Sequence, residues 1–90
     1  MKAMKATVFG KVQGVWFRDS TCTEAQNLNI FGWVKNMPDG TVMLEAEGEE
    51  SDLKQLEAWL HGGSPRSTVE RVDVEWQKAH GNFLTFEINF

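Results

Sequence analysis

Near its start the chain reads Met4-Lys-Ala-Thr-Val-Phe-Gly-Lys-Val-Gln-Gly-Val-Trp-Phe-Arg18. Apolar and polar residues alternate over Met4–Phe9, which predicts a strand with one buried face. The two glycines that follow predict a loop, and apolar residues at helical spacing over Asp19–Leu28 predict a helix. A strand, a loop and a helix therefore follow one another directly, and we expect Asn29 to end the helix in a left-handed conformation.

The remainder of the chain predicts three further strands, a second helix and a short last strand. The expected elements are strands over Gly32–Asn36, Thr41–Glu47 and Val72–Trp76, a helix over Ser51–His61 with Ser51 as its N-cap, and a last strand over Leu84–Phe90. The order β-α-β-β-α-β with a terminal addition is the split βαβ arrangement of α+β, ferredoxin-like domains. We expect residues 1–90 to form a single domain with an antiparallel sheet and both helices on one face.

The predicted topology creates a candidate anion site at one edge of the sheet. The first two strands run parallel with the third between them, so the loop after the first strand should lie near Asn36, at the end of the second. Two glycines in a strand-to-helix loop let successive N–H groups converge beside the positive end of a helix dipole, which suits an anion. Arg18, at the start of the helix, can add a bidentate grip on a phosphate.

Each of these features also has a simpler interpretation. A glycine-bearing turn before a helix is more often only a turn. Arg18 alone could be a plain surface residue, and Asn36 before Met37-Pro-Asp-Gly40 could simply initiate a turn. The expected meeting of the loop, Arg18 and Asn36 at one edge is what favours a phosphate site.

Two motifs resemble the signatures of the acylphosphatase family. The first is Gly10-Lys-Val-Gln-Gly-Val-Trp-Phe-Arg18, and the second is Gly32-Trp-Val-Lys-Asn36 followed by Gly40-Thr-Val42. Gly63-Ser-Pro-Arg-Ser67 is also similar to the pattern that follows the family's second helix. The resemblance covers nearly the whole chain and implies the same ferredoxin-like fold. It departs from the family at Trp16, where members often carry glycine or phenylalanine, and at Asn29, where they often carry a helix-ending glycine.

The resemblance implies a metal-independent hydrolase that cleaves the carboxyl–phosphate bond of acyl phosphates. Arg18 would bind the phosphate, Asn36 would position the attacking water, and inorganic phosphate would be both product and inhibitor. We expect no metal and no cofactor. The phosphate would lie in a cradle of backbone amides, which are those of Gln13, Gly14, Val15, Trp16, Phe17 and Arg18.

Composition and charge narrow the possible partners and the location. The net charge is −4, with 13 acidic and 9 basic residues, which opposes non-specific attraction to nucleic acid or an anionic membrane. No stretch approaches the ~20 apolar residues of a membrane span, and the N-terminal apolar run is too short for a signal peptide. One cysteine cannot form an intramolecular disulfide. We therefore expect a cytoplasmic monomer whose partner is a small-molecule acyl phosphate.

Two functions from other classes stay open at this point. A non-catalytic anion-binding module could use the same fold. A variant of this alternative is a domain that originally handled carbamoyl phosphate in a larger maturation protein. An RNA-recognition module shares the element order but needs basic and aromatic residues on its central strands. Here the third strand is expected to present Met43, Glu45 and Glu47 to solvent instead.

Overall fold

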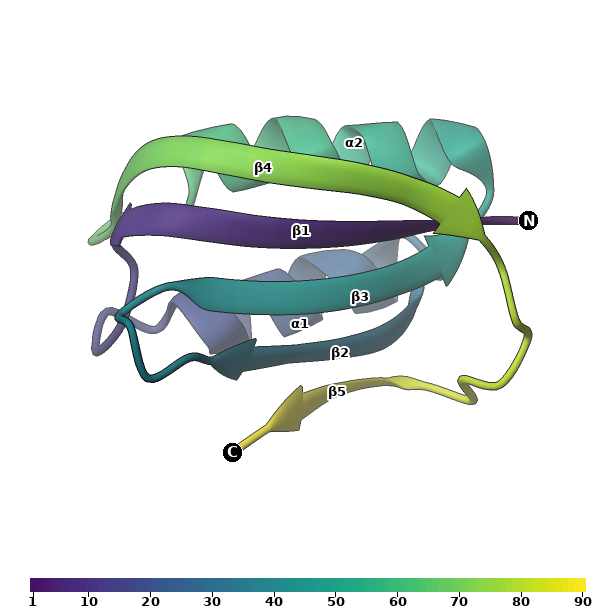
Figure 1. The fold of residues 1–90 in the computed structure, drawn as a ribbon, viewed down its shortest axis with the longest axis horizontal. Coiled ribbons are helices and arrows are strands. Elements are labelled where there is room, and N and C mark those ends of the chain that lie inside the picture. Colours follow the sequence, from purple (N-terminus) through teal and green to yellow (C-terminus); the bar gives the residue numbers. More distant parts are fainter.

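Alternating apolar residues build a five-stranded sheet in the computed structural model, which describes all residues from 1 to 90. The strand order is β4-β1-β3-β2-β5 (Figure 1). The elements are β1 (Lys2–Lys11), α1 (Phe17–Asn27), β2 (Phe31–Asn36), β3 (Val42–Gly48), α2 (Glu50–Gly62), β4 (Thr68–Lys78) and β5 (Phe86–Asn89).

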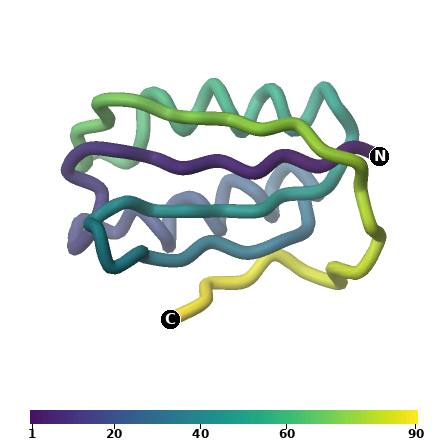
Figure 2. The backbone as a smooth tube through the Cα atoms, in the orientation of Figure 1, coloured from purple at the N-terminus to yellow at the C-terminus, as the bar shows by residue number.

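The pairing directions confirm the predicted ferredoxin-like topology. β1 pairs antiparallel with β3 and β4, and β3 pairs antiparallel with β2. Because β1 and β2 both run against β3, they run parallel to each other, and their C-terminal ends reach the same edge of the sheet (Figure 2). β5 pairs parallel with β2, so the added strand makes the sheet mixed.

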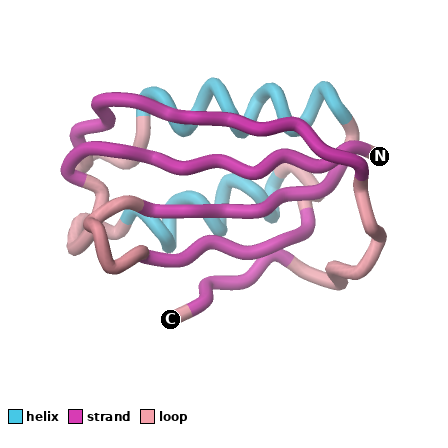
Figure 3. Tube along the Cα trace, in the orientation of Figure 1, coloured by secondary structure: helices cyan, strands magenta, loops and turns pink.

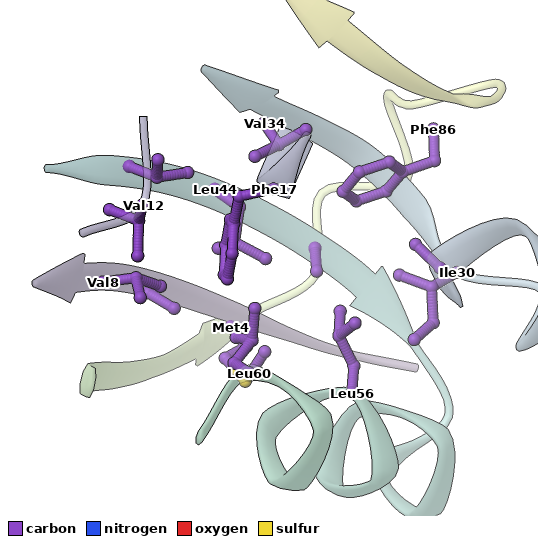
Figure 4. Close-up of a cluster of buried hydrophobic side chains, with 14 of the residues drawn as sticks. Met4, Val8, Val12, Phe17, Ile30, Val34, Leu44, Leu56, Leu60 and Phe86 are labelled. Carbon is purple, nitrogen blue, oxygen red and sulfur yellow. The ribbon is translucent and has the colours of Figure 1, made fainter. Parts of the chain in front are cut away.

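Both helices cover one face of the sheet, as expected (Figure 3). Leu53, Leu56 and Leu60 recur on one face of α2 and are fully buried. They face the apolar residues of the central strands, among them Met4, Val8 and Leu44, which Figure 4 shows as one cluster. Phe17, at the start of α1, joins this cluster, and its ring centre lies 5.7 Å from that of Trp59 on α2.

Several element ends differ from the sequence-based expectation. β1 runs over Lys2–Lys11 rather than Met4–Phe9, so Gly10 lies in the strand and not in the loop, and β4 runs over Thr68–Lys78 rather than Val72–Trp76. α1 begins at Phe17 rather than near Asp19. Ser51 as the N-cap of α2 was wrong, because the helix begins one residue earlier and Glu49 caps it without a side-chain hydrogen bond. The last strand is limited to Phe86–Asn89, since it pairs only with Gly32–Lys35 of β2. Asn29 does follow α1 with φ 56°, as predicted.

Glu47 is buried, so the expectation that it faces solvent was wrong. Its side chain is only 2% exposed, although strand alternation puts it on the face opposite the helices. One carboxylate oxygen accepts a hydrogen bond from the amide of His80 at 2.7 Å, and the other accepts one from the amide of Gly81 at 3.0 Å. The connection between β4 and β5 is thereby fastened over the end of β3.

Replacing Glu47 should therefore destabilise the fold. Glu47→Ala removes two hydrogen bonds to a carboxylate, and each bond of this kind contributes about 1.5–3 kcal/mol. Glu45→Ala, on the same face of β3 but without a hydrogen-bonded partner, should change the free energy of unfolding by less than about 0.5 kcal/mol. Urea unfolding of the two variants measures the difference. Equal stability of the two variants would contradict the proposed role of the Glu47 carboxylate.

Candidate active site

The loop between β1 and α1 bends through two left-handed residues. Gly14 has φ 72° and Trp16, the residue that precedes α1, has φ 62°. Glycine adopts this conformation freely, whereas a tryptophan is seldom found in it. Left-handed residues in a turn direct neighbouring N–H groups toward one side of the chain, which forms a concave anion site.

The amides of this loop have no acceptors within the protein. No backbone N–H from Gln13 to Asp19 donates a hydrogen bond to another part of the chain, and the amide of Ser20, which reaches the Trp16 carbonyl at 3.0 Å, is the first to do so. No side chain caps α1 either. Unpaired N–H groups at a helix start carry the positive end of the helix dipole. The run of amides is therefore available to a negatively charged group.

Sheet register places Asn36 near this loop. Val42 of β3 stands opposite Val8 of β1 on one side and opposite Asn36 of β2 on the other. Val8 and Asn36 are thus two strand spacings apart, roughly 10 Å. Only two buried side-chain polar atoms in the protein lack a hydrogen-bond partner, and one of them is the Oδ1 atom of Asn36. Asn36 lines the pocket described below, whereas the residue that carries the other atom does not. Buried polar atoms are nearly always paired, so the unpaired oxygen of Asn36 is unusual.

The side chain of Gln13 ties the loop to the turn that follows Asn36. Its Nε2 atom donates to the carbonyl oxygens of Met37, at 2.8 Å, and Thr41, at 2.9 Å. The turn itself is ordered by Asp39, whose carboxylate accepts from the hydroxyl and amide of Thr41, and these bonds lower the pKa of Asp39. Sequence reasoning considered only the backbone amide of Gln13, since nothing local indicates that its side chain reaches another loop.

Arg18 lies in the first turn of α1 and takes part in no ion pair. Its Nη1 atom lies 3.4 Å from the carbonyl oxygen of Asn89, a long hydrogen bond. Its guanidinium carbon lies 4.9 Å from the centre of the Phe90 ring. The positive charge of Arg18 is thus held at the end of β5 without a carboxylate partner.

One open pocket of ≈ 390 Å³ brings these groups together. Of the predicted cradle residues, Gly14, Trp16, Phe17 and Arg18 line this pocket together with Asn36, whereas Gln13 and Val15 do not. The rest of the lining consists of Val12, Asp19, Ile88 and Phe90. Ile88 and Phe90 were missed from the sequence, because the pairing of β5 beside β2 was not part of the prediction.

Other chemistry-bearing side chains lie outside the pocket. Cys22 does not line the pocket. Burial raises the pKa of the Cys22 thiol, and the nearby carboxylates of Asp19 and Glu87 raise this pKa further. A thiolate at Cys22 is therefore disfavoured. No three side chains among His, Cys, Asp and Glu gather where they could hold a metal ion. Neither helix has the length and apolar character needed to cross a membrane.

Comparison with known proteins identifies the family. The acylphosphatase family model matches residues 4–88. An acylphosphatase from Anaeromyxobacter dehalogenans is 44% identical over 86 residues, covering 96% of this chain and 92% of the relative. The crystal structure of an acylphosphatase from Bacillus subtilis superposes with a TM-score of 0.96 at 36% identity and covers 100% of both chains. HypF from T. kodakarensis is also similar, with a TM-score of 0.85 at 28% identity, but this chain covers only 12% of it. The chain belongs to the acylphosphatase family.

Proposed function

We propose that this protein hydrolyses acyl phosphates to a carboxylate and inorganic phosphate, without a metal ion. One observation carries the proposal: loop residues whose amides have no acceptor, an arginine without an ion-pair partner and Asn36 line one pocket. The family match and the relatives named acylphosphatase supply the substrate class.

The amides and Arg18 would hold the phosphoryl group. The unpaired amides of Gly14, Trp16, Phe17 and Arg18, which line the pocket, can donate to its oxygens, and the guanidinium can reach two oxygens at once. In a loose phosphoryl-transfer transition state, negative charge is spread over the equatorial oxygens, so donors fixed in advance stabilise it. Because these donors are held by the turn and the helix, little reorganisation is needed when the charge develops.

The leaving group explains why so few side chains suffice. An acyl phosphate releases a carboxylate whose conjugate acid has a pKa near that of Asp or Glu, about 4. Such a group departs as an anion, so no general acid is required. Positioning and charge stabilisation then supply the catalysis.

Asn36 would position the attacking water. A carboxamide has no useful proton affinity, so Asn36 cannot act as a base, but its Oδ1 can accept a hydrogen bond from a water. The proton of the attacking water would pass to a phosphate oxygen of the substrate itself.

Several expectations stay predictions from composition and resemblance. These are the monomeric state, the cytoplasmic location, the organisation of residues 1–90 as one domain and the inhibition by inorganic phosphate. The first three need measurements on the purified protein and in cells, whereas the last follows from the proposed phosphate cradle and is tested below.

Hydrolysis of benzoyl phosphate should survive a chelator. The proposed chemistry places charge stabilisation on amides and Arg18 and assigns no step to a metal. The rate should therefore be unchanged by EDTA or by added Mg²⁺, measured from the ultraviolet absorbance of the substrate. A loss of turnover with EDTA that a divalent metal restores would count against the mechanism.

Inorganic phosphate should inhibit competitively, because it presents the same tetrahedral anion to the amides and Arg18.

Phosphate monoesters should be poor substrates, since an alkoxide leaving group needs an acid that the proposed site lacks. Initial rates with benzoyl phosphate and a phosphate monoester, each with increasing phosphate, measure both effects. Similar turnover of the two substrates would refute the leaving-group argument.

Arg18 and Asn36 should fail in different ways when substituted. Arg18→Ala should weaken phosphate binding and turnover together, and Arg18→Lys should rescue little, because an ammonium cannot reproduce a two-pronged contact. Asn36→Ala should leave phosphate affinity nearly intact while kcat falls on the order of 10²-fold or more. Such a loss marks an interaction made in the transition state only.

Calorimetry with inorganic phosphate, steady-state rates and circular dichroism distinguish these outcomes. Near-normal turnover of a folded Asn36→Ala variant would overturn the assignment of Asn36. A loss of phosphate binding in Asn36→Ala as severe as that in Arg18→Ala would overturn the division of roles.

A further inference from the structure

Trp16 presents an indole that neither the fold nor the phosphate cradle uses. Its side chain is 69% exposed and makes no hydrogen bond to another residue, although it lines the candidate pocket. By contrast, Trp59 is partly buried and packs against the core. Single exposed apolar residues are common on protein surfaces, whereas several gathered in one place mark a binding surface. Trp16 lines the pocket together with the apolar side chains of Ile88 and Phe90.

The backbone of Trp16 makes the indole more unusual. The residue is held at φ 62°, in the left-handed region that a side chain with a Cβ atom disfavours. Glycine would take this conformation without strain and would offer the same amide to the cradle. Backbone strain of this kind is typical of functional positions, where something other than stability maintains it.

The pocket is larger than a phosphate group requires, and part of its wall is apolar. Its volume of ≈ 390 Å³ lies within the range of about 300–1,000 Å³ that holds drug-sized ligands. Ile88 and Phe90 add apolar side chains to its wall, and the Phe90 ring is fully exposed. An apolar group bound there would cover surfaces that are otherwise left in water.

We propose that Trp16 forms an acyl-group subsite that selects aromatic acyl phosphates over small aliphatic ones. The inference rests on the proposed function and extends it to the acyl half of the substrate. The acyl carbon is joined to the phosphate through a single bridging oxygen, so a phosphate bound at the Trp16 amide keeps the acyl group near that residue's own indole. An aromatic ring can stack on the indole, whereas a methyl group covers little of it.

The test compares two substrates in three variants. The kcat/KM ratio of benzoyl phosphate to acetyl phosphate is measured for the unmodified protein, Trp16→Gly and Trp16→Phe. Trp16→Gly suits the left-handed backbone and should lower the ratio roughly 3- to 10-fold, the size of an aromatic pair contact. Trp16→Phe keeps an aromatic face and should lower it less than about 2-fold. Using the ratio cancels any common effect of the substitution on the phosphate cradle.

Trp76→Ala is the matched control, because Trp76 is also exposed but lies on β4, away from this pocket. It should leave the ratio unchanged. An unchanged ratio in Trp16→Gly, with both substrates still hydrolysed, would overturn the subsite and leave the proposed function standing. Equal falls in Trp16→Gly and Trp76→Ala would overturn it as well. If the unmodified protein hydrolyses neither substrate, the proposed function itself fails.

Discussion

The site depends on the position of β3 between β1 and β2. Val42 pairs with Val8 on one neighbouring strand and with Asn36 on the other. A shift of either pairing by one residue would turn a whole strand's buried side chains toward solvent, so the apolar core fixes the register. The same core therefore fixes the separation between the loop after β1 and the end of β2. Hydrophobic burial, together with the hydrogen bonds of Gln13 to the turn after Asn36, sets the separation between the two halves of the site.

Close contacts between strands explain the first glycine of each motif. A Cβ atom on Gly32 would lie 1.9 Å from the Glu45 carbonyl oxygen, and one on Gly10 would lie 2.1 Å from that of Thr68. Both residues also have strongly positive φ angles, 145° and 130°. The two glycines thus let β3 and β4 approach at the places where β2 begins and β1 nears its end. Part of what marks the family's motifs is needed for the sheet rather than for chemistry.

Periodicity in the sequence was enough to predict the strands, both helices and the topology. The helical spacing of Leu53, Leu56 and Leu60 and the alternation in β1 are local patterns that a single face of burial produces. Because the topology brings β1 and β2 to one edge, Arg18 and Asn36 could be predicted to share a site before their surroundings were known. The pocket brings them together, whereas their roles in catalysis still await the experiments above.

What could not be predicted depends on segments that meet only in three dimensions. The alternation of β3 places Glu47 among the solvent-facing residues. The β4–β5 connection nevertheless covers it, and two amides of that connection donate hydrogen bonds to its carboxylate. Ile88 and Phe90 reach the pocket only because β5 pairs with β2. Contacts of this kind leave no periodic signal in the sequence, since their partners lie far away along the chain.

The double hydrogen bond of Gln13 has a consequence for motion. The Met37 carbonyl accepts from both Gln13 Nε2 and the amide of Gly40, so the loop and the β2–β3 turn share an acceptor. Neither segment can open far without breaking bonds to the other, which makes them one unit of local unfolding. Ordering the loop with an anion would then also slow opening of the turn. The rate of hydrogen exchange at the Gly40 amide, which lies in the turn, would therefore show whether an anion is bound at the loop before α1.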